Sequence, residues 1–139
     1  MSTKAADDAV QPPTLLIVDD EDRILSSLRR SLRREGYRIV TSESVHHALE
    51  ILDAEPVDMI LSDQKMPGMS GLQFLSEAAL RCPGATRMLI TGWTEEIPPE
   101  KLEELGIREL ITKPWDDTRL KEVLRRACDA AAPEIAARA

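Results

Sequence analysis

Cysteine, long apolar runs and an excess of positive charge are scarce or absent in this sequence of 139 residues. The only cysteines, Cys82 and Cys128, have no metal-ligand spacing, so we expect buried, reduced thiols in a cytoplasmic protein. No apolar stretch approaches the ~20 residues that cross a bilayer, and residues 1–13 lack a basic, signal-like start, so we expect neither export nor membrane insertion. The net charge of −7 would repel a phosphate backbone, which argues against direct nucleic-acid binding.

The sequence does contain five short apolar runs that alternate with amphipathic segments. The runs are partly β-branched and predict buried strands at 15–18, 38–41, 57–61, 87–90 and 107–111. In the segments between them, apolar residues recur at spacings of three and four, as expected for helices with one buried face. This alternation predicts an α/β fold, with a doubly wound, five-stranded parallel sheet that is covered on both faces.

Local signals place several helix ends. The first helix is expected over about 22–35, where it closes at Gly36, and its buried residues are predicted to be Ile24, Leu25, Leu28 and Leu32. Ser70 and Gln73 have the spacing of a capping box at the start of the third helix, which Pro83 stops. The fourth helix is expected to start at the Pro98–Pro99 pair and to end before Gly106.

The chain is expected to hold one domain over 14–129. Residues 1–13 are predicted to be a flexible tail, and residues 130–139 a tail or the start of a linker. We favour a stand-alone domain, with the N-terminal part of a longer regulator as the alternative.

Polar residues follow four of the five apolar runs. Asp19 and Asp20 follow the first run and Asp63 the third, while Thr91 and Lys113 follow the fourth and fifth. Ligands of open α/β sheets bind beyond the carboxyl ends of the strands, where the strand order reverses. We expect the strand order 2-1-3-4-5, in which the three aspartates share one crevice and Thr91 lies on the neighbouring strand.

Three carboxylates in one crevice repel one another unless protons or a cation neutralise them. Oxygen ligands without histidine or cysteine favour Mg²⁺, or Mn²⁺, over zinc. One divalent cation and Lys113 would balance the three carboxylates, and such a site can accept a phosphoryl group on an aspartate. A single aspartate or threonine after a strand is more often a helix cap, so the prediction depends on the whole set.

Four sequence runs, VDDE, SDQKMPGMSG, ITG and KPW, resemble in this order the receiver domain of two-component response regulators. The resemblance covers about residues 14–128 and implies a flavodoxin-like receiver fold. It implies that Asp63 is the phosphoacceptor, that Asp19 and Asp20 hold the metal, and that Thr91 and Lys113 bind the phosphoryl oxygens. It further implies that the backbone carbonyl of Lys65 is a metal ligand, and that the bond before Pro114 is cis.

The sequence departs from the family pattern at Leu110, where a tyrosine or phenylalanine is usual. This departure argues against signalling through the family's usual coupling between the hydroxyl that matches Thr91 and an aromatic ring. We expect the switch to be read out through Trp93 and the fourth helix, with Trp115 on the adjacent loop.

The resemblance also implies partners. A sensor histidine kinase or a histidine phosphotransfer protein is the expected donor, and the arginines of the first helix suit docking to an acidic helix bundle. The effector is expected to read the fourth helix, fifth strand and fifth helix, a face that could also form a homodimer. Output through a cyclic-di-nucleotide phosphodiesterase or a DNA-binding domain is the alternative to a stand-alone switch.

Two rival functions share parts of the pattern. An FMN carrier would need a phosphate-binding loop after the first strand, where Asp19, Asp20, Glu21 and Asp22 would repel phosphate. A haloacid-dehalogenase-type phosphatase would use Asp20 and Asp22 as its Asp-x-Asp pair, but Arg23 and Ile24 replace the glycine and threonine expected next. The protein is therefore not expected to be an enzyme beyond phosphorylation from small donors and loss of its own phosphoryl group. His46 and His47 are expected to be surface or groove residues because adjacent helical positions do not share a face.

Overall fold

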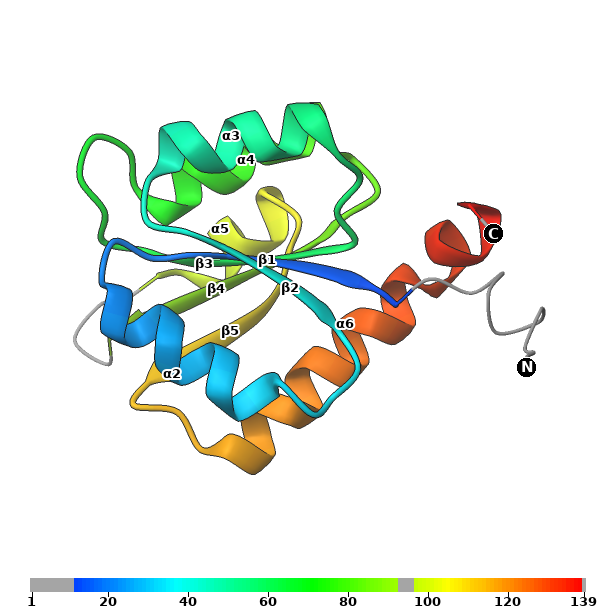
Figure 1. Cartoon of the computed structure of the whole chain (residues 1–139). Helices are drawn as coiled ribbons and strands as arrows, with labels where there is room; N and C mark the ends of the chain where they lie inside the picture. Colours follow the sequence, from blue (N-terminus) through cyan, green and yellow to red (C-terminus); the bar gives the residue numbers. More distant parts are fainter. Residues whose placement is uncertain (1–11, 93–96, 139) are drawn as a thin grey trace.

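A five-stranded parallel sheet forms the centre of the part that the structure, a computed structural model, describes: residues 12–92 and 97–138, with side chains up to 131 (Figure 1). The strands are β1 (Thr14–Val18), β2 (Arg38–Ser42), β3 (Met59–Asp63), β4 (Thr86–Gly92) and β5 (Ile107–Lys113). Their order is β2-β1-β3-β4-β5, which confirms the predicted order and fold class. The carboxyl ends of β1 and β3 are therefore neighbours at one edge of the sheet.

Helices cover both faces of the sheet (Figure 1). On one face, α2 (Asp22–Leu32) and α6 (Asp117–Arg138) pack on a core that includes Ile17, Leu61 and Ile111. The other face carries α3 (Val45–Ala54), α4 (Gly71–Arg81) and α5 (Pro99–Glu104). Because side chains alternate along a strand, each face takes every second residue of β1 and β3.

The capping box predicted for α4 is confirmed. Ser70 Oγ accepts a hydrogen bond from the backbone N–H of Gln73 at 3.2 Å, and Gln73 Oε1 accepts one from the N–H of Ser70 at 2.9 Å. The helix ends at Arg81, before Pro83, and α5 starts at Pro99 as its proline pair predicts. These ends depend on residues close in sequence, which is why local signals located them.

Several predicted bounds were wrong by a few residues. Helix α2 ends at Leu32, and the chain then turns to Gly36, which has a φ of +90°. Its residue Ile24 is only partly buried. Strand β3 begins two residues later than predicted, at Met59, and includes Asp63 as its last residue. Strand β2, predicted to be buried, lies at the sheet edge and is mostly half-exposed, because only β1 pairs with it.

The described residues include only part of the two predicted tails. Residues 1–11 of the predicted N-terminal tail, and Trp93, lie outside the described residues. Residues 130–138, predicted to be a tail or the start of a linker, continue helix α6. The proposed domain limits remain predictions.

Cys82 and Cys128 are free thiols, and both are half-buried rather than fully buried as expected. Cys82 caps the end of α4, where its Sγ contacts the carbonyl oxygen of Val57 at 3.3 Å. No helix in the described part of the chain is long and apolar enough to span a bilayer.

Candidate functional site

The carboxyl ends of β1 and β3 bring together the three predicted aspartates. One carboxylate oxygen from each of Asp19, Asp20 and Asp63 lies within 4.8 Å of the others. Asp19 is completely buried and Asp63 is 5% exposed, whereas Asp20 is exposed. The sheet thus presents two desolvated carboxylates with a third at the solvent edge.

Lys113, the last residue of β5, reaches the same cluster. Its Nζ lies 2.9 Å from Asp63 Oδ1 and 3.1 Å from Asp19 Oδ2. The peptide bond between Lys113 and Pro114 is cis, as the family resemblance implies. One ammonium group therefore joins two of the three carboxylates and leaves a formal local charge of −2.

Backbone hydrogen bonds hold the Asp19 carboxylate and the ends of the neighbouring strands in place. Asp19 Oδ1 accepts a hydrogen bond from the N–H of Glu21 at 2.9 Å, and the Asp19 N–H donates to the carbonyl of Ser42 at 3.1 Å. On the β3 side, the N–H of Gln64 donates to the carbonyl of Ile90 at 3.1 Å. These contacts hold the ends of neighbouring strands in the register that the site requires.

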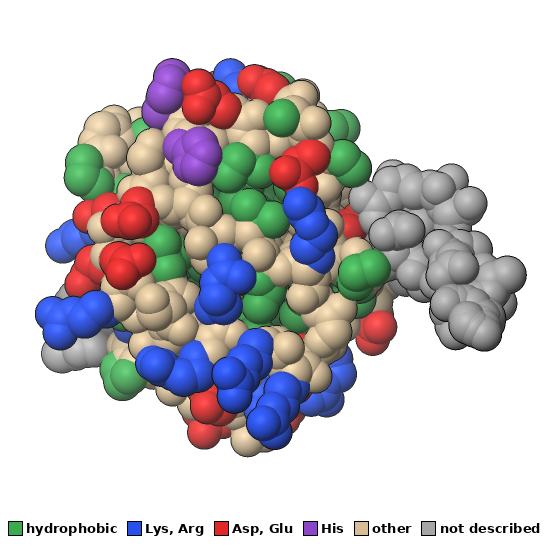
Figure 2. Space-filling view, in the orientation of Figure 1, with side chains coloured by type: hydrophobic (Ala, Val, Ile, Leu, Met, Phe, Trp, Pro, Cys, Tyr) green, Lys and Arg blue, Asp and Glu red, His purple; other side chains and the backbone are tan. Residues whose placement is uncertain are grey.

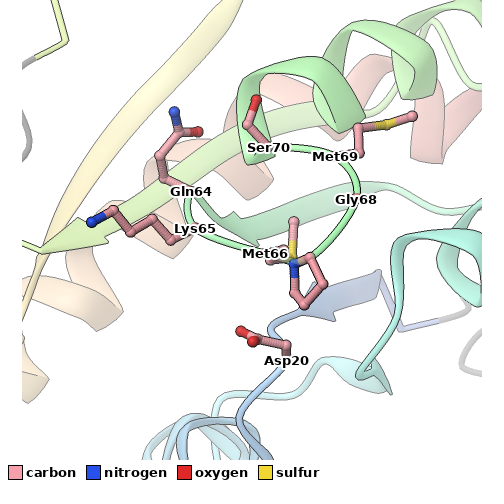
Figure 3. Close-up of a pocket in the computed structure, with 8 residues that line it drawn as sticks. Asp20, Gln64, Lys65, Met66, Gly68, Met69 and Ser70 are labelled. Carbon is pink, nitrogen blue, oxygen red and sulfur yellow. The ribbon is translucent and has the colours of Figure 1, made fainter.

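An open hollow of about 520 Å³ lies beside the acidic cluster (Figure 3). Asp20 forms one side, and the loop from Gln64 to Ser70 forms the other. Lys65 lies in this loop with its side chain directed away from Asp20. An ammonium group has no lone pair to offer a cation, so only the backbone carbonyl of Lys65 could contribute to the predicted metal site. Gly68 adopts a φ of +83°, a left-handed conformation that favours glycine in this turn.

Burial raises the pKa of Asp19, although the Glu21 N–H and the charge of Lys113 partly offset it. Burial also raises the pKa of Asp63, against the hydrogen bond from Lys113. Burial alone would lower the pKa of Lys113, but the contacts of its ammonium group with Asp63 and Asp19 outweigh this effect and raise its pKa. Carboxyl groups with raised pKa values stabilise the fold at pH below about 4, and this contribution is lost as pH rises through their folded pKa.

The donor set fits a small divalent cation. Carboxylate oxygens are the preferred ligands of Mg²⁺, and at its bond lengths opposite ligands lie about 4 Å apart. The oxygens of Asp19, Asp20 and Asp63 are within 4.8 Å of one another, so small side-chain movements would suffice. A divalent cation would cancel the formal charge of −2 that remains after Lys113 is counted.

Thr91, the hydroxyl residue predicted for the site, follows the apolar part of β4 and is 1% exposed. It is paired in register with Thr112, next to the pair formed by Gly92 and Lys113. The sheet therefore places the hydroxyl and the ammonium group on adjacent strands at the same edge.

Sequence reasoning missed the role of Gln64. Its carbonyl accepts from the N–H of Gly71 at 2.8 Å, and its Oε1 accepts from the N–H of Leu72 at 3.0 Å. The side chain thus joins the loop after Asp63 to the start of α4. The only signal in the sequence for this contact is the position of Gln64 directly after Asp63.

The chain matches the model of a known protein family over most of its length. A family model described as the response regulator receiver domain matches residues 15–125. The chain belongs to this family. The match includes all of the predicted site residues, and the receiver fold explains why they gather at one edge of the sheet.

Relatives of this receiver domain include longer regulators. It is 41% identical over 118 residues to the hydrogenase transcriptional regulatory protein HoxA of Cupriavidus necator, covering 84% of this chain and 24% of the relative. It is 32% identical over 123 residues to the transcriptional regulatory protein GlrR of Escherichia coli, covering 88% of this chain and 28% of GlrR. The chain therefore spans about a quarter of the length of these curated relatives.

A solved structure agrees with the fold of this receiver domain. The signal receiver domain of an HD domain-containing protein from Pseudomonas fluorescens matches with a TM-score of 0.80 and 28% identity. The match covers 88% of this chain and 99% of that one.

The remaining predicted positions lie away from the acidic cluster. His46 and His47 are both exposed, as predicted, and the ring of His47 contacts Ser42 Oγ at 3.2 Å. Leu110 is half-buried among the apolar residues beneath α5, where Leu102 and Leu105 also lie. An aliphatic side chain thus fills the position where the family usually has an aromatic ring.

Proposed function

We propose that this receiver domain is a phosphoryl-accepting signalling switch and that Asp63 is the acceptor. The observation that carries the proposal is the contact of one ammonium group, Lys113 Nζ, with both Asp63 and Asp19 at 2.9 and 3.1 Å. A buried carboxylate beside a lysine and two further carboxylates has the charges needed to bind a cation and then an anionic phosphoryl group. Residues that only capped helices would not need this combination.

Asp19, Asp20, Asp63 and the backbone carbonyl of Lys65 would hold Mg²⁺, or Mn²⁺, which when bound would neutralise charge on the transferring phosphoryl group. An Asp63 carboxylate oxygen then attacks phosphorus, and the bond from phosphorus to the donor nitrogen of a phosphohistidine breaks. The leaving imidazole keeps the electron pair and takes up a proton. Lys113 and the Thr91 hydroxyl donate hydrogen bonds to the phosphoryl oxygens.

The proposal is tested by phosphorylation with acetyl phosphate in Mg²⁺, followed by borohydride trapping and peptide mapping. We expect one phosphoryl group per chain, on the peptide that holds Asp63, and no uptake when a chelator removes the cation. A label on another residue, or uptake that survives chelation, would refute the proposal. Multiple turnover of a generic phosphate ester would instead support the phosphatase alternative.

We propose that the phosphorylated form is read through α5, β5 and α6. Two charge-assisted contacts, from Thr91 and Lys113, would supply about 3 to 6 kcal/mol. Changing the ratio of the switched to the unswitched conformation from 1:99 to 99:1 requires about 5.5 kcal/mol. We therefore expect phosphorylation to give a mixture of the two conformations, and binding of the partner to complete the change. The half-buried Leu110 would move by repacking among Leu102 and Leu105 rather than by rotation of a ring.

The comparisons favour control of transcription as the output. HoxA and GlrR are transcriptional regulatory proteins, and this chain matches about a quarter of each. We propose that the domain controls a DNA-binding output, either in a longer chain or in a separate effector, without contacting nucleic acid itself. An enzymatic output, the alternative expected from the sequence, remains the second candidate, and the matched solved receiver domain belongs to an HD domain-containing protein. The unpaired thiols of Cys82 and Cys128 agree with a cytoplasmic location.

We propose that a basic groove along α2 binds an acidic donor protein. Arg29, Arg30 and Arg33 line it, with Tyr37 and Ile39, between α2 and the edge strand β2. Figure 2 shows basic side chains gathered over this part of the molecule. Arg29 also donates to the carbonyl of Ile39 and to Thr41 Oγ1, at 3.3 and 3.2 Å, so Arg30 and Arg33 are the cleaner residues to change.

The double variant Arg30→Glu/Arg33→Glu is expected to slow phosphotransfer from the cognate kinase about tenfold or more, because opposite charges steer protein association. Phosphorylation by acetyl phosphate, which needs no docking, should stay within about twofold of the wild-type rate. The double variant Arg125→Glu/Arg126→Glu on α6 is the control with the same change in charge. Equal slowing of both reactions by the α2 variant would rule out a docking role.

A further inference from the structure

A half-buried arginine on β4 has no part in the proposed phosphoryl chemistry. Arg87 donates from Nη1 to the carbonyl oxygen of Leu105 at 2.6 Å, and burial lowers the pKa of its guanidinium. Its Nε is buried without a hydrogen-bond partner among the described residues. Desolvating a cation and leaving one donor unpaired is unfavourable, so this side chain calls for a specific explanation.

The guanidinium holds the turn between α5 and β5. Leu105 is the C-cap of α5, and a cation at the last carbonyl of a helix is favourable. Gly106 follows with a φ of +70°, and a Cβ on it would lie 2.8 Å from Arg87 Nη2. Arg87 thus fixes the end of α5 and leaves little room for a side chain at Gly106, the residue that leads into β5.

An irregularity in the pairing of β4 with β5 begins at the same place. Arg87 pairs with Ile107, but Met88 pairs with Glu109, so Arg108 is an extra residue on β5. A single extra residue reverses the face on which every later side chain lies. Accordingly, Ile107 packs in the core beneath α3, α4 and α5, whereas Ile111 packs in the core beneath α2 and α6.

This reversal determines where Lys113 points. Asp19, Asp63 and Lys113 each come two residues after a side chain of the core beneath α2 and α6, namely Ile17, Leu61 and Ile111. All three therefore share the side of the sheet on which the ammonium and the two carboxylates meet. Without the extra residue, Lys113 would lie on the opposite side.

We propose that Arg87 is a positioning residue for Lys113, because it holds the α5–β5 turn and thereby the register of β5. Only the kinetic test of this role, which measures phosphoryl uptake, rests on the proposed function. Arg87 lies near the start of β4, five residues before Gly92, which pairs with Lys113, so its effect on the site would be indirect.

The first test is the phosphoryl-uptake rate from acetyl phosphate in Mg²⁺, expressed per folded molecule. Arg87→Met is expected to lower this rate about tenfold or more, since small errors of position are costly in such sites. Arg87→Lys keeps a donor near Leu105 and should recover most of the rate. Arg81→Met, which removes a surface arginine that pairs with Asp53, is the matched control and should stay within about twofold.

Combination with Lys113→Ala distinguishes positioning from general stabilisation. If Arg87 acts through Lys113, Arg87→Met should slow the Lys113→Ala protein by less than about twofold. Losses that multiply in the double variant would overturn the proposal, as would a wild-type rate in Arg87→Met.

A second readout does not need phosphorylation. The Lys113 ammonium, held by two carboxylates, should give a resolved ¹⁵N NMR signal in the wild type and in Arg87→Lys but not in Arg87→Met. Gly106→Ala, which keeps the arginine but presses on Nη2, should weaken the same signal. If Arg87→Met does not fold, an unchanged Lys113 signal in Gly106→Ala overturns the proposal. If the wild type takes up no phosphoryl group, the proposed function is refuted, and the NMR signal of Lys113 alone then decides whether Arg87 positions it.

Discussion

Replacing Asp63 by asparagine is expected to abolish phosphoryl uptake and, in the cation-free protein at pH 7, to raise the free energy of unfolding. Uptake is lost because an amide cannot act as the nucleophile. Stability rises because burial raises the pKa of Asp63, so that its ionised form at neutral pH disfavours the folded state. The gain should be on the order of 1 kcal/mol, a usual size for a single substitution.

The gain in stability of Asp63→Asn should depend on pH and on the cation. The gain should disappear at pH below about 4, where the carboxyl group is protonated in both states. It should also shrink or reverse in Mg²⁺, which stabilises the wild type through a carboxylate that the variant lacks. Urea unfolding with and without Mg²⁺, beside acetyl phosphate labelling, measures all three effects.

Asp53→Asn is the matched control for Asp63→Asn. Asp53 is an exposed aspartate that pairs with Arg81 at 2.9 Å, so its loss should change the stability by less than about 1 kcal/mol and leave uptake unchanged. A loss of stability in cation-free Asp63→Asn at pH 7 would contradict the electrostatic argument. Wild-type labelling of that variant would contradict the assignment of the acceptor.

The fold and the acidic cluster were predictable because both leave strong patterns in the sequence. Five apolar runs predict the strands, and the acids after the first and third runs meet once the order is 2-1-3-4-5. The capping box of α4 was equally accessible, since Ser70 and Gln73 satisfy each other within one turn. Patterns with a short period in the sequence are readable without knowledge of the packing.

Features set by contacts between distant segments were not predictable in the same way. The limits of β3 depend on its pairing with β1 and β4, which shifts the strand to Met59–Asp63. The contact between Arg87 and Leu105 spans 18 residues, and a lone arginine in a strand sequence does not show where its guanidinium lies. The same holds for the exposure of β2, which follows from its place at the edge of the sheet.

Replacing Gly71 by alanine is expected to destabilise the protein by about 3 kcal/mol, at the upper end for an overpacked site. Two effects oppose each other at this position, the first residue of α4. Helix propensity favours alanine over glycine by up to about 1 kcal/mol. The packing argues the other way, because a Cβ there would lie 2.2 Å from the carbonyl oxygen of Asp63 and 2.9 Å from Gln64 Cα. Leu89 Cδ1, at 2.8 Å, could move by a side-chain rotation, but the other two atoms belong to the backbone and cannot, so packing should prevail.

The overlap also predicts a functional effect, because the start of α4 would push on the residue proposed to accept the phosphoryl group. We expect phosphoryl uptake by folded Gly71→Ala to fall about a hundredfold, the loss expected from a displacement near 1 Å. Gly36→Ala is the control: Gly36 has a φ of +90° with nothing within 4 Å of its Cβ position, so only backbone strain of about 1 kcal/mol should result. Urea unfolding and acetyl phosphate labelling of both variants separate the two cases. Stability equal to the wild type in Gly71→Ala would mean that helix propensity outweighs packing. Undiminished uptake would mean that the added methyl group does not displace the backbone of Asp63.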